Sequence, residues 1–285
     1  MLHHEDTALR ASRPLTQDIL TRNNVKVMGR GTQPILFAHG FGCDQHMWRF
    51  VAPAFEANYR VVLFDYVGSG RSELRAYNPE RYSSLHGYAE DILDICRALD
   101  LKDVIFVGHS VSSMIGLLAA IREPERFQRL VFVSPSPRYI NEAPGYVGGF
   151  ERHDIEELLQ TMDKNFIGWA NFLAPVIMNR PDRPELNQEL TESFCSTDPT
   201  IARRFAEVTF FSDNRKDLPK LTVPSLIIQC SEDLIAPRQV GEYLHQNLAR
   251  STLRITQATG HCPHMSAPEE TISIIQDYLA QASMS

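Results

Sequence analysis

The chain has 285 residues, enough for one large α/β domain or for a core with an inserted subdomain. Hydrophobic residues make up 43% and charged residues 22%, the ordinary balance of a globular protein, and the net charge is −7. This negative charge, with no local run of lysine or arginine, argues against nucleic acid or an anionic membrane as a partner, because phosphate binding needs a basic patch.

The N-terminal segment and the cysteines bear on where the protein works. Residues 1–14 are polar and lack the apolar stretch of a secretory signal, so we expect a poorly ordered extension. The five cysteines are scattered, which fits reduced thiols in a cytoplasm. No C-x-x-C pair, H-E-x-x-H motif or membrane-length apolar run is present. The sequence therefore predicts a cytoplasmic protein without a metal or a cofactor.

Short apolar runs alternate with helical patterns along most of the chain. Residues 18–27 are predicted to form a hairpin that turns at Asn23 and Asn24. Apolar residues at helical spacing follow around 48–55 and 88–99. The other strands are predicted at residues 35–38, 61–64, 104–107, 130–133, 225–230 and 253–255. Strands alternating with helices predict an α/β fold whose mostly parallel sheet is covered on both faces.

The long interval between the fourth and fifth of these apolar strands has no convincing strand. It carries helical stretches that are rich in aromatic residues. We expect a helical lid at residues 136–219 over the C-terminal edge of the sheet, where open α/β sheets bind ligands. The core would then comprise residues 15–135 and 220–285. The alternative is a helical layer that packs only for stability.

Ser110 follows a buried strand directly and precedes an apolar, helix-prone segment. A serine at such a sharp turn has its hydroxyl exposed above the sheet edge, close to the amides of the new helix. This is the nucleophile elbow G-x-S-x-G, with Ser112 in the place of the last glycine. Serine is the next small residue, so the departure is mild. The alternative interpretation is a buried strand followed by a chance G-x-S.

A serine nucleophile needs a base to take its proton and an acid to orient that base. Asp233 follows the strand at 225–230, and His261 lies in the loop after the strand at 253–255. The chain order Ser, Asp, His is the one in which these partners follow an elbow serine. We therefore predict a triad of Ser110, Asp233 and His261.

Each partner has a competitor. Glu232 precedes Asp233, but adjacent residues leaving a strand point in opposite directions, and Asp233 lies one step further out. His264 is the competing base, although the helix predicted to follow it favours a packing role. Neither Cys43 nor Cys262 has the strand–turn–helix setting of a nucleophile. Two further side chains near the site, His39 and His109, are expected to line it or pack beside it.

Acyl transfer also needs N–H donors aimed at the oxyanion. One candidate is the backbone amide of Val111, directly after the nucleophile. The other is the amide of Phe41 in the His-Gly-Phe-Gly run at 39–42, which follows an early strand. The ring of Phe41 is expected to form part of the pocket wall.

The glycine-rich run at 65–72 follows a strand, as phosphate-binding loops do. It lacks the G-x-G-x-x-G spacing, and no helix begins promptly behind it. We expect a tight turn braced by Asp65 and Arg71.

Several runs of the chain resemble a known family. They are FAHGFGCDQ (37–45), LFDYVGSGRS (63–72), SPSPRY (134–139), GGF (148–150), FCSTDP (194–199) and GHCPHMS (260–266). From about Leu20 onward the chain is similar to RsbQ, a bacterial α/β-hydrolase of an energy-stress signalling pathway, and to the plant strigolactone and karrikin receptors. The run GHSVS (108–112) is similar to the elbow of the plant receptors, so Ser112 is compatible with catalysis.

This resemblance implies an α/β-hydrolase fold with a four-helix lid and the triad named above. It also implies an apolar, substrate-binding pocket beside His109. The aromatic residues that it implies for the pocket lining are Phe41, Tyr139, Phe150, Trp169 and Phe210. Each of these rings could instead serve as packing within the lid.

Two functions of different classes follow. The first is a serine hydrolase that cleaves a small, mostly apolar ester or lactone. The second is a ligand sensor of the RsbQ type that activates a partner phosphatase with a PAS domain, with slow or vestigial hydrolysis. Perhydrolase and carbon–carbon hydrolase chemistry also keep the serine, whereas Ser110 argues against dehalogenases and epoxide hydrolases, which use an aspartate.

Overall fold

The computed structural model describes residues 15–282, so the predicted extension at 1–14 lies outside the described residues. A seven-stranded sheet has the order β1-β3-β2-β4-β5-β6-β7. Strand β1 is antiparallel to β3, and the other neighbouring pairs are parallel. The strands are β1 (Lys26–Met28), β2 (Pro34–Ala38), β3 (Arg60–Leu63), β4 (Val104–His109), β5 (Phe127–Val133), β6 (Ser225–Glu232) and β7 (Ser251–Thr259). The predicted α/β fold with a mostly parallel sheet is confirmed.

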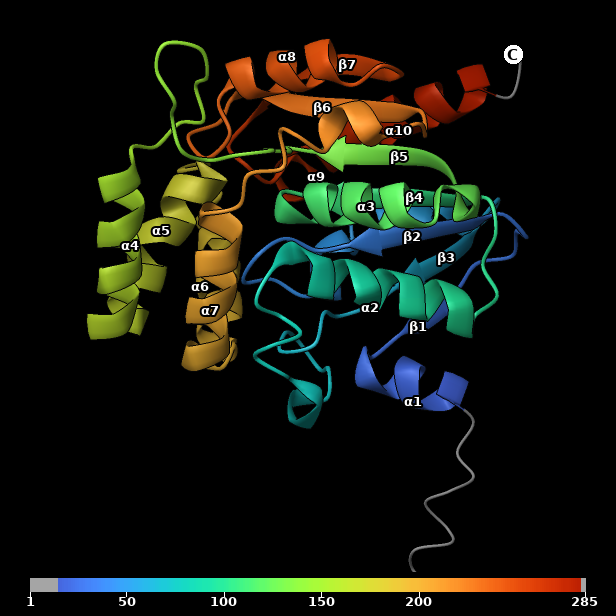
Figure 1. Ribbon diagram of the computed structural model, residues 1–285, viewed down its shortest axis with the longest axis horizontal. Helices are drawn as coiled ribbons and strands as arrows, with labels where there is room; N and C mark the ends of the chain where they lie inside the picture. Colours follow the sequence, from blue (N-terminus) through green and yellow to red (C-terminus); the bar gives the residue numbers. More distant parts are fainter. Residues whose placement is uncertain (1–14, 283–285) are drawn as a thin grey trace, which may run out of the picture.

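Helices flank the sheet and extend beyond one end of it (Figure 1). They are α1 (Leu15–Arg22), α2 (Leu85–Ala98), α3 (Val111–Arg122), α4 (Arg152–Lys164), α5 (Phe166–Met178), α6 (Pro184–Ser196), α7 (Pro199–Phe210), α8 (Arg238–Asn247), α9 (Pro263–Ser266) and α10 (Pro268–Ala282). None of the helices in the described part of the chain is both long and apolar enough to cross a membrane.

Alternation along the strands divides the core into two apolar clusters. Ile35 and Phe37 of β2 face one cluster, which also takes in α10 and the inserted helices α4–α7. Leu36 and Ala38 face the other, which contains the apolar sides of α2, α3 and α8. Successive strand residues point to opposite faces, so a sheet buried on both sides needs continuous apolar runs. All six residues of β4 are buried, and this strand carries the site at its C-terminal end.

The helices α4–α7 are inserted between β5 and β6. Figure 1 shows them gathered beyond the tips of the strand arrows, at the edge where the parallel strands end. The two connections to the core meet in an isolated β-bridge between Arg138 and Asp213. An ion pair joins the same two side chains, with Arg138 Nη1 2.5 Å from Asp213 Oδ2.

Two sequence predictions near the N-terminus are wrong. The hairpin predicted at 18–27 is instead the end of helix α1 followed by β1, because Asn24 turns the chain with a φ of 45°. Asparagine tolerates this left-handed conformation, so the Asn23–Asn24 pair marks a helix-to-strand turn here. The helix predicted around 48–55 is two short 3₁₀ helices, Gln45–Trp48 and Ala52–Phe55, and the second has Pro53 in its first turn.

Candidate active site

Ser110 lies at the turn between β4 and α3 in a strained backbone conformation. Its φ is 56° and its ψ is −123°, which non-glycine residues rarely adopt. The turn is held because the Ser110 N–H donates to the carbonyl of Val133 on the neighbouring strand at 2.8 Å. The Ser110 side chain is therefore presented at the end of the sheet, against the first turn of α3.

The structure brings Ser110, His261 and Asp233 together in one hydrogen-bonded series. Ser110 Oγ lies 2.7 Å from Nε2 of His261, and Nδ1 of His261 lies 2.7 Å from Oδ2 of Asp233. All three residues are buried. Because a carboxylate only accepts, the bond to Asp233 requires a proton on Nδ1, which leaves Nε2 with a lone pair toward the serine hydroxyl.

Asp233, and not Glu232, faces His261. Asp233 follows β6 directly, and its Oδ1 accepts hydrogen bonds from the backbone amides of Ile235 and Ala236 at 2.8 and 3.0 Å. Both carboxylate oxygens thus have partners, and the side chain is fixed toward the imidazole. Glu232 is the last residue of β6 and its side chain is exposed.

The loop that carries His261 is held by the inserted helices. The His261 N–H donates to the carbonyl of Ile177, near the end of α5, at 2.7 Å. Gly260, which precedes it, has a φ of 82°, and a Cβ atom there would come within 2.1 Å of the Met178 carbonyl oxygen. Glycine is therefore needed for this approach. The position of His261 depends on the insertion as well as on the sheet.

The two expected oxyanion donors are the backbone amides of Val111 and Phe41. Val111 begins α3, and the amides of a first helical turn have no partner inside the helix. Phe41 lies in the loop after β2, between two glycines, and it lines the same cavity as Ser110. Gly42 has a φ of 71°, and a Cβ atom there would meet the ring of Phe194 at 2.1 Å, so the loop and α6 approach closely.

A small apolar cavity of about 30 Å³ opens on Ser110 and His261. Four of the six residues predicted to line the pocket do so: Phe41, His109, Tyr139 and Phe210. Phe150 and Trp169 are not among its lining residues. The ring of Phe150 packs at 6.4 Å from that of Phe210, and the ring of Trp169 lies 5.1 Å from that of Phe194, so both support the wall from behind.

The cavity also contains residues that the sequence did not single out for it. They are Ile177 of α5, Leu190 and Phe194 of α6, Thr209 of α7, and Ile235 after β6, with the thiols of Cys43 and Cys262. The helical spacing of Leu190 and Phe194 indicated a buried face, but not that this face lies above Ser110. Only the packing of the insertion supplies that information.

The competing reactive groups lie in unfavourable settings. Burial, with the nearby His261, lowers the pKa of His264 to about 3, and its ring is not bonded to Ser110. Burial raises the pKa of the Cys43 and Cys262 thiols well above their ordinary value, so neither is a thiolate at neutral pH. Burial also raises the pKa of Tyr139 to about 12, and its protonated hydroxyl lies 3.4 Å from Ser110 Oγ.

The glycine-rich run at 65–72 is a turn organised by Asp65. Its carboxylate accepts from the backbone amides of Gln45 and Arg71, both at 2.9 Å, and from the side chain of Asn24 at 2.7 Å. The sequence predicted a turn braced by Asp65 and Arg71. Arg71 contacts Asp65 through its backbone amide. A larger, open hollow of about 950 Å³ lies between α2 and α7 and contains none of the predicted site residues.

A parallel sheet, a strained serine between strand and helix, and a histidine–carboxylate pair after later strands together define a hydrolase-type site. The chain belongs to the alpha/beta hydrolase fold family, whose sequence profile matches residues 33–268.

Among its relatives is the karrikin insensitive 2 receptor IA of Petunia hybrida. The two are 40% identical over 257 residues, which cover 90% of this chain and 93% of the receptor. Strigolactone esterase D14 of Arabidopsis thaliana is 37% identical over 260 residues, which cover 91% and 97% of the two chains. The structure of a hydrolase from Oleispira antarctica matches with a TM-score of 0.91 at 46% identity, covering 93% of this chain and 97% of that one. These relatives confirm the resemblance to the α/β-hydrolase family and to the plant receptors.

Proposed function

We propose that this protein is a serine hydrolase that cleaves a small, mostly apolar ester or lactone. The observation that carries the proposal is the buried series from Ser110 Oγ through His261 to Asp233, which ends in an apolar cavity. A hydroxyl becomes a useful nucleophile only when a positioned base can take its proton, and this arrangement supplies one.

The reaction begins when Ser110 Oγ attacks the carbonyl carbon as its proton passes to Nε2 of His261. The negative charge on the carbonyl oxygen is stabilised by the amides of Phe41 and Val111. His261 then gives its proton to the departing alcohol oxygen, which for a lactone stays attached as the far end of the acyl chain. Water, with His261 again as base, releases the acid from Ser110. Asp233 remains ionised and holds the imidazole in its tautomer.

We assign residues 136–219 the role of a lid over a core of residues 15–135 and 220–285. The cavity of about 30 Å³ is far smaller than the roughly 300–1,000 Å³ of ordinary ligand sites. An ester therefore enters only when α5, α6 or α7 moves away from Phe41 and Ser110. The absence of charged side chains from the lining favours an apolar acyl group or lactone ring.

The names of the relatives favour a second function on the same site. One relative named above is a receptor and another is an esterase. A sensor would use slow hydrolysis to change the lid, and a partner protein, such as a PAS-domain phosphatase, would read that change. Turnover separates the two functions, because a sensor releases its product slowly after one cycle whereas an esterase cycles continuously.

A cytoplasmic location agrees with the state of the thiols. None of the five cysteines, all within the described chain, forms a disulfide, and four are buried. Free thiols of this kind persist where the compartment is reducing.

The test is hydrolysis of p-nitrophenyl acetate by the wild type and by Ser110→Ala. We expect kcat to fall by about 10⁴-fold or more in Ser110→Ala, because the three residues of a catalytic triad act as one unit and the loss of any one removes most of the rate enhancement. Ser113→Ala is the matched control, since this buried serine of α3 donates to the Gly108 carbonyl at 3.0 Å. Equal rates for wild type and Ser110→Ala would refute the proposal.

A further inference from the structure

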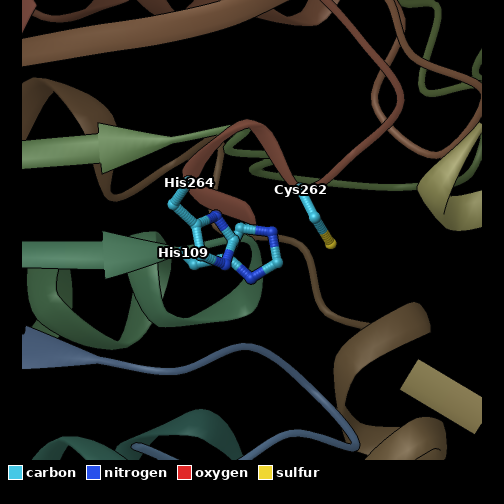
Figure 2. A group of neighbouring side chains, drawn as sticks. All are labelled: His109, Cys262 and His264. Carbon is cyan, nitrogen blue, oxygen red and sulfur yellow. The ribbon is translucent and has the colours of Figure 1, made fainter. Parts of the chain in front are cut away.

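Behind His261 lies a buried cluster of three side chains that the proposed reaction does not use. His109 ends β4, while Cys262 and His264 come from the loop and first residues of α9. One potential ligand atom from each of the three lies within 4.8 Å of the others. Figure 2 shows the two imidazole rings next to each other with the Cys262 side chain beside them. The ring centroids of His109 and His264 are 4.3 Å apart.

The imidazoles of this cluster have unused ring nitrogens. Neither nitrogen of His264 makes a hydrogen bond with any residue that the structure describes, and the side chain is fully buried. His109 is 3% exposed, and its Nδ1 likewise has no described partner. A buried polar group without a partner is destabilising, so such groups usually bind something.

The tautomer of His109 follows from its one hydrogen bond. Its Nε2 lies 2.8 Å from the carbonyl oxygen of His261, which can only accept, so Nε2 carries the proton. In the neutral ring, Nδ1 then has a lone pair and no partner among the described residues. Gly40 approaches this ring closely, because a Cβ atom at Gly40 would come within 2.5 Å of Nδ1.

We propose that His109, Cys262 and His264 bind one Cu(I) ion. Thiolate and imidazole are the ligands that soft Cu(I) prefers. One thiolate, two neutral imidazoles and a monovalent cation sum to zero charge, which suits a buried site without a carboxylate among its ligands. Zn²⁺ with the same ligands would leave one uncompensated positive charge. On binding, the Cys262 thiol loses its proton to solvent as the Cu–S bond forms.

Sequence motifs do not predict this site. Motif searches rely on ligands at fixed spacing along one segment, and the prediction of no metal site rested on the lack of such motifs. Here one ligand is adjacent to Ser110 and the other two follow His261, so the fold alone brings them together.

Binding is measured directly and does not depend on whether Ser110 hydrolyses esters. The protein carries Cys195→Ser throughout, because the exposed Cys195 thiol would bind Cu(I) by itself. Cu(I) is titrated without oxygen against a competing chelator, bicinchoninate. We expect one tightly bound ion per chain and quenching of Trp48 fluorescence, since the Trp48 ring lies 4.6 Å from that of His264.

Two variants and a matched control assign the ligands. Cys262→Ser and His264→Gln should each weaken Cu(I) binding at least tenfold. Cys96→Ser removes another buried thiol, on α2 in the other apolar cluster, and should bind as the parent does. Circular dichroism melting identifies any variant that has lost its fold. If one variant is unfolded, the Cu(I) affinity of the other variant tests the proposal.

X-ray absorption at the copper edge gives the ligand set independently of the variants. One sulfur and two nitrogen scatterers are expected. The proposal is overturned if no stoichiometric ion binds, if Cys262→Ser and His264→Gln both bind as the parent does, if the spectrum shows sulfur alone, or if Zn²⁺ competes Cu(I) away from these residues.

Discussion

Ser112 replaces the last glycine of the elbow motif, and its side chain links two loops beside the site. Its hydroxyl donates to the carbonyl oxygen of His39 and bonds to the Tyr66 hydroxyl at 2.9 Å. The residue is fully buried, so both contacts are made without water. The serine therefore ties the first turn of α3 to the loop after β2, which carries the proposed oxyanion donor Phe41.

Tyr139 is the second polar group that contacts Ser110, after His261, and we expect it to position the proposed nucleophile. Its hydroxyl, 3.4 Å from Ser110 Oγ, favours the rotamer that faces His261. Tyr139→Phe keeps the ring packed on Phe210 at 5.2 Å but removes this bond. One neutral hydrogen bond contributes about 1 kcal/mol, so kcat should fall about fivefold with KM nearly unchanged.

The matched control is Tyr146→Phe. The Tyr146 hydroxyl donates to the Arg138 carbonyl at 2.6 Å, outside the cavity lining. Its loss should leave kcat and KM for p-nitrophenyl acetate within a factor of two. If Tyr139→Phe behaves in the same way as this control, Tyr139 only lines the pocket.

Helix α6 has direct polar links to the core. Glu189 on α6 pairs with Arg49 through two parallel hydrogen bonds of 2.5 Å. One turn further along, Ser193 Oγ donates to the Gly42 carbonyl at 2.8 Å. Phe194 packs directly on the same loop. If the proposed lid opens along α6, the ion pair between Arg49 and Glu189 must break.

Glu189→Gln should make opening easier and so speed hydrolysis. Both side chains of the Arg49 pair are partly exposed, 25% and 32%, so the pair contributes at most about 1 kcal/mol. Even p-nitrophenyl acetate exceeds the closed cavity, so kcat/KM should rise about twofold to fivefold. Glu192→Gln, whose carboxylate bonds only to Gln188 within α6 among the described hydrogen bonds, should change little. A lower kcat/KM for Glu189→Gln would contradict a role for this pair in holding the lid closed.

At the scale of elements, the sequence was informative where burial leaves a simple signature. The apolar runs at β2, β4 and β5 sit where they were expected, because strands buried on both faces have few polar positions. Strands β6 and β7 extend further than predicted, since their polar ends are still paired. Helix α1 was missed because its eight residues are shorter than the window of about 11–18 residues over which a helical period is recognised in a sequence.

Part of the site could also be predicted from the sequence, because it depends on where the strands end. Residues directly beyond neighbouring parallel strands converge at one edge, so Ser110, Asp233 and His261 could be placed together from strand ends alone. The residues of the cavity wall could not be predicted in this way, because Trp169 and Phe194 both lie on buried helix faces. Only the packing angle of the inserted helices decides which of the two rings reaches the cavity beside Ser110.

For the whole molecule, a buried carboxylate joins the N-terminal helix to the core. Asp91 of α2 has no exposed side-chain surface, and it accepts bonds from Arg81 at 2.7 Å and Tyr82 at 2.9 Å. Arg22, the last residue of α1, lies 3.3 Å from the same carboxylate. These contacts secure α1 and the segment before α2 against the sheet.

Asp91→Asn should lower the free energy of unfolding by about 2–3 kcal/mol, because it leaves two arginines facing a neutral amide. For a chain of this size the melting temperature should fall by roughly 4–10 °C, as measured by calorimetry. Asp94→Asn is the control, since Asp94 contacts the same arginines but is 20% exposed, and it should cost about 1 kcal/mol or less. An equal loss of unfolding free energy in the two variants would show that the burial of Asp91 does not determine its contribution to stability.

The central claim is that His261 and Asp233 activate Ser110 as a nucleophile. A small serine-directed fluorophosphonate, followed by peptide mass spectrometry, tests it directly. We predict one adduct per chain, located on Ser110, which forms at least a hundredfold more slowly in His261→Gln and is absent from Ser110→Ala. An adduct on another residue, or equal labelling of Ser110 when His261 is replaced, would contradict the account.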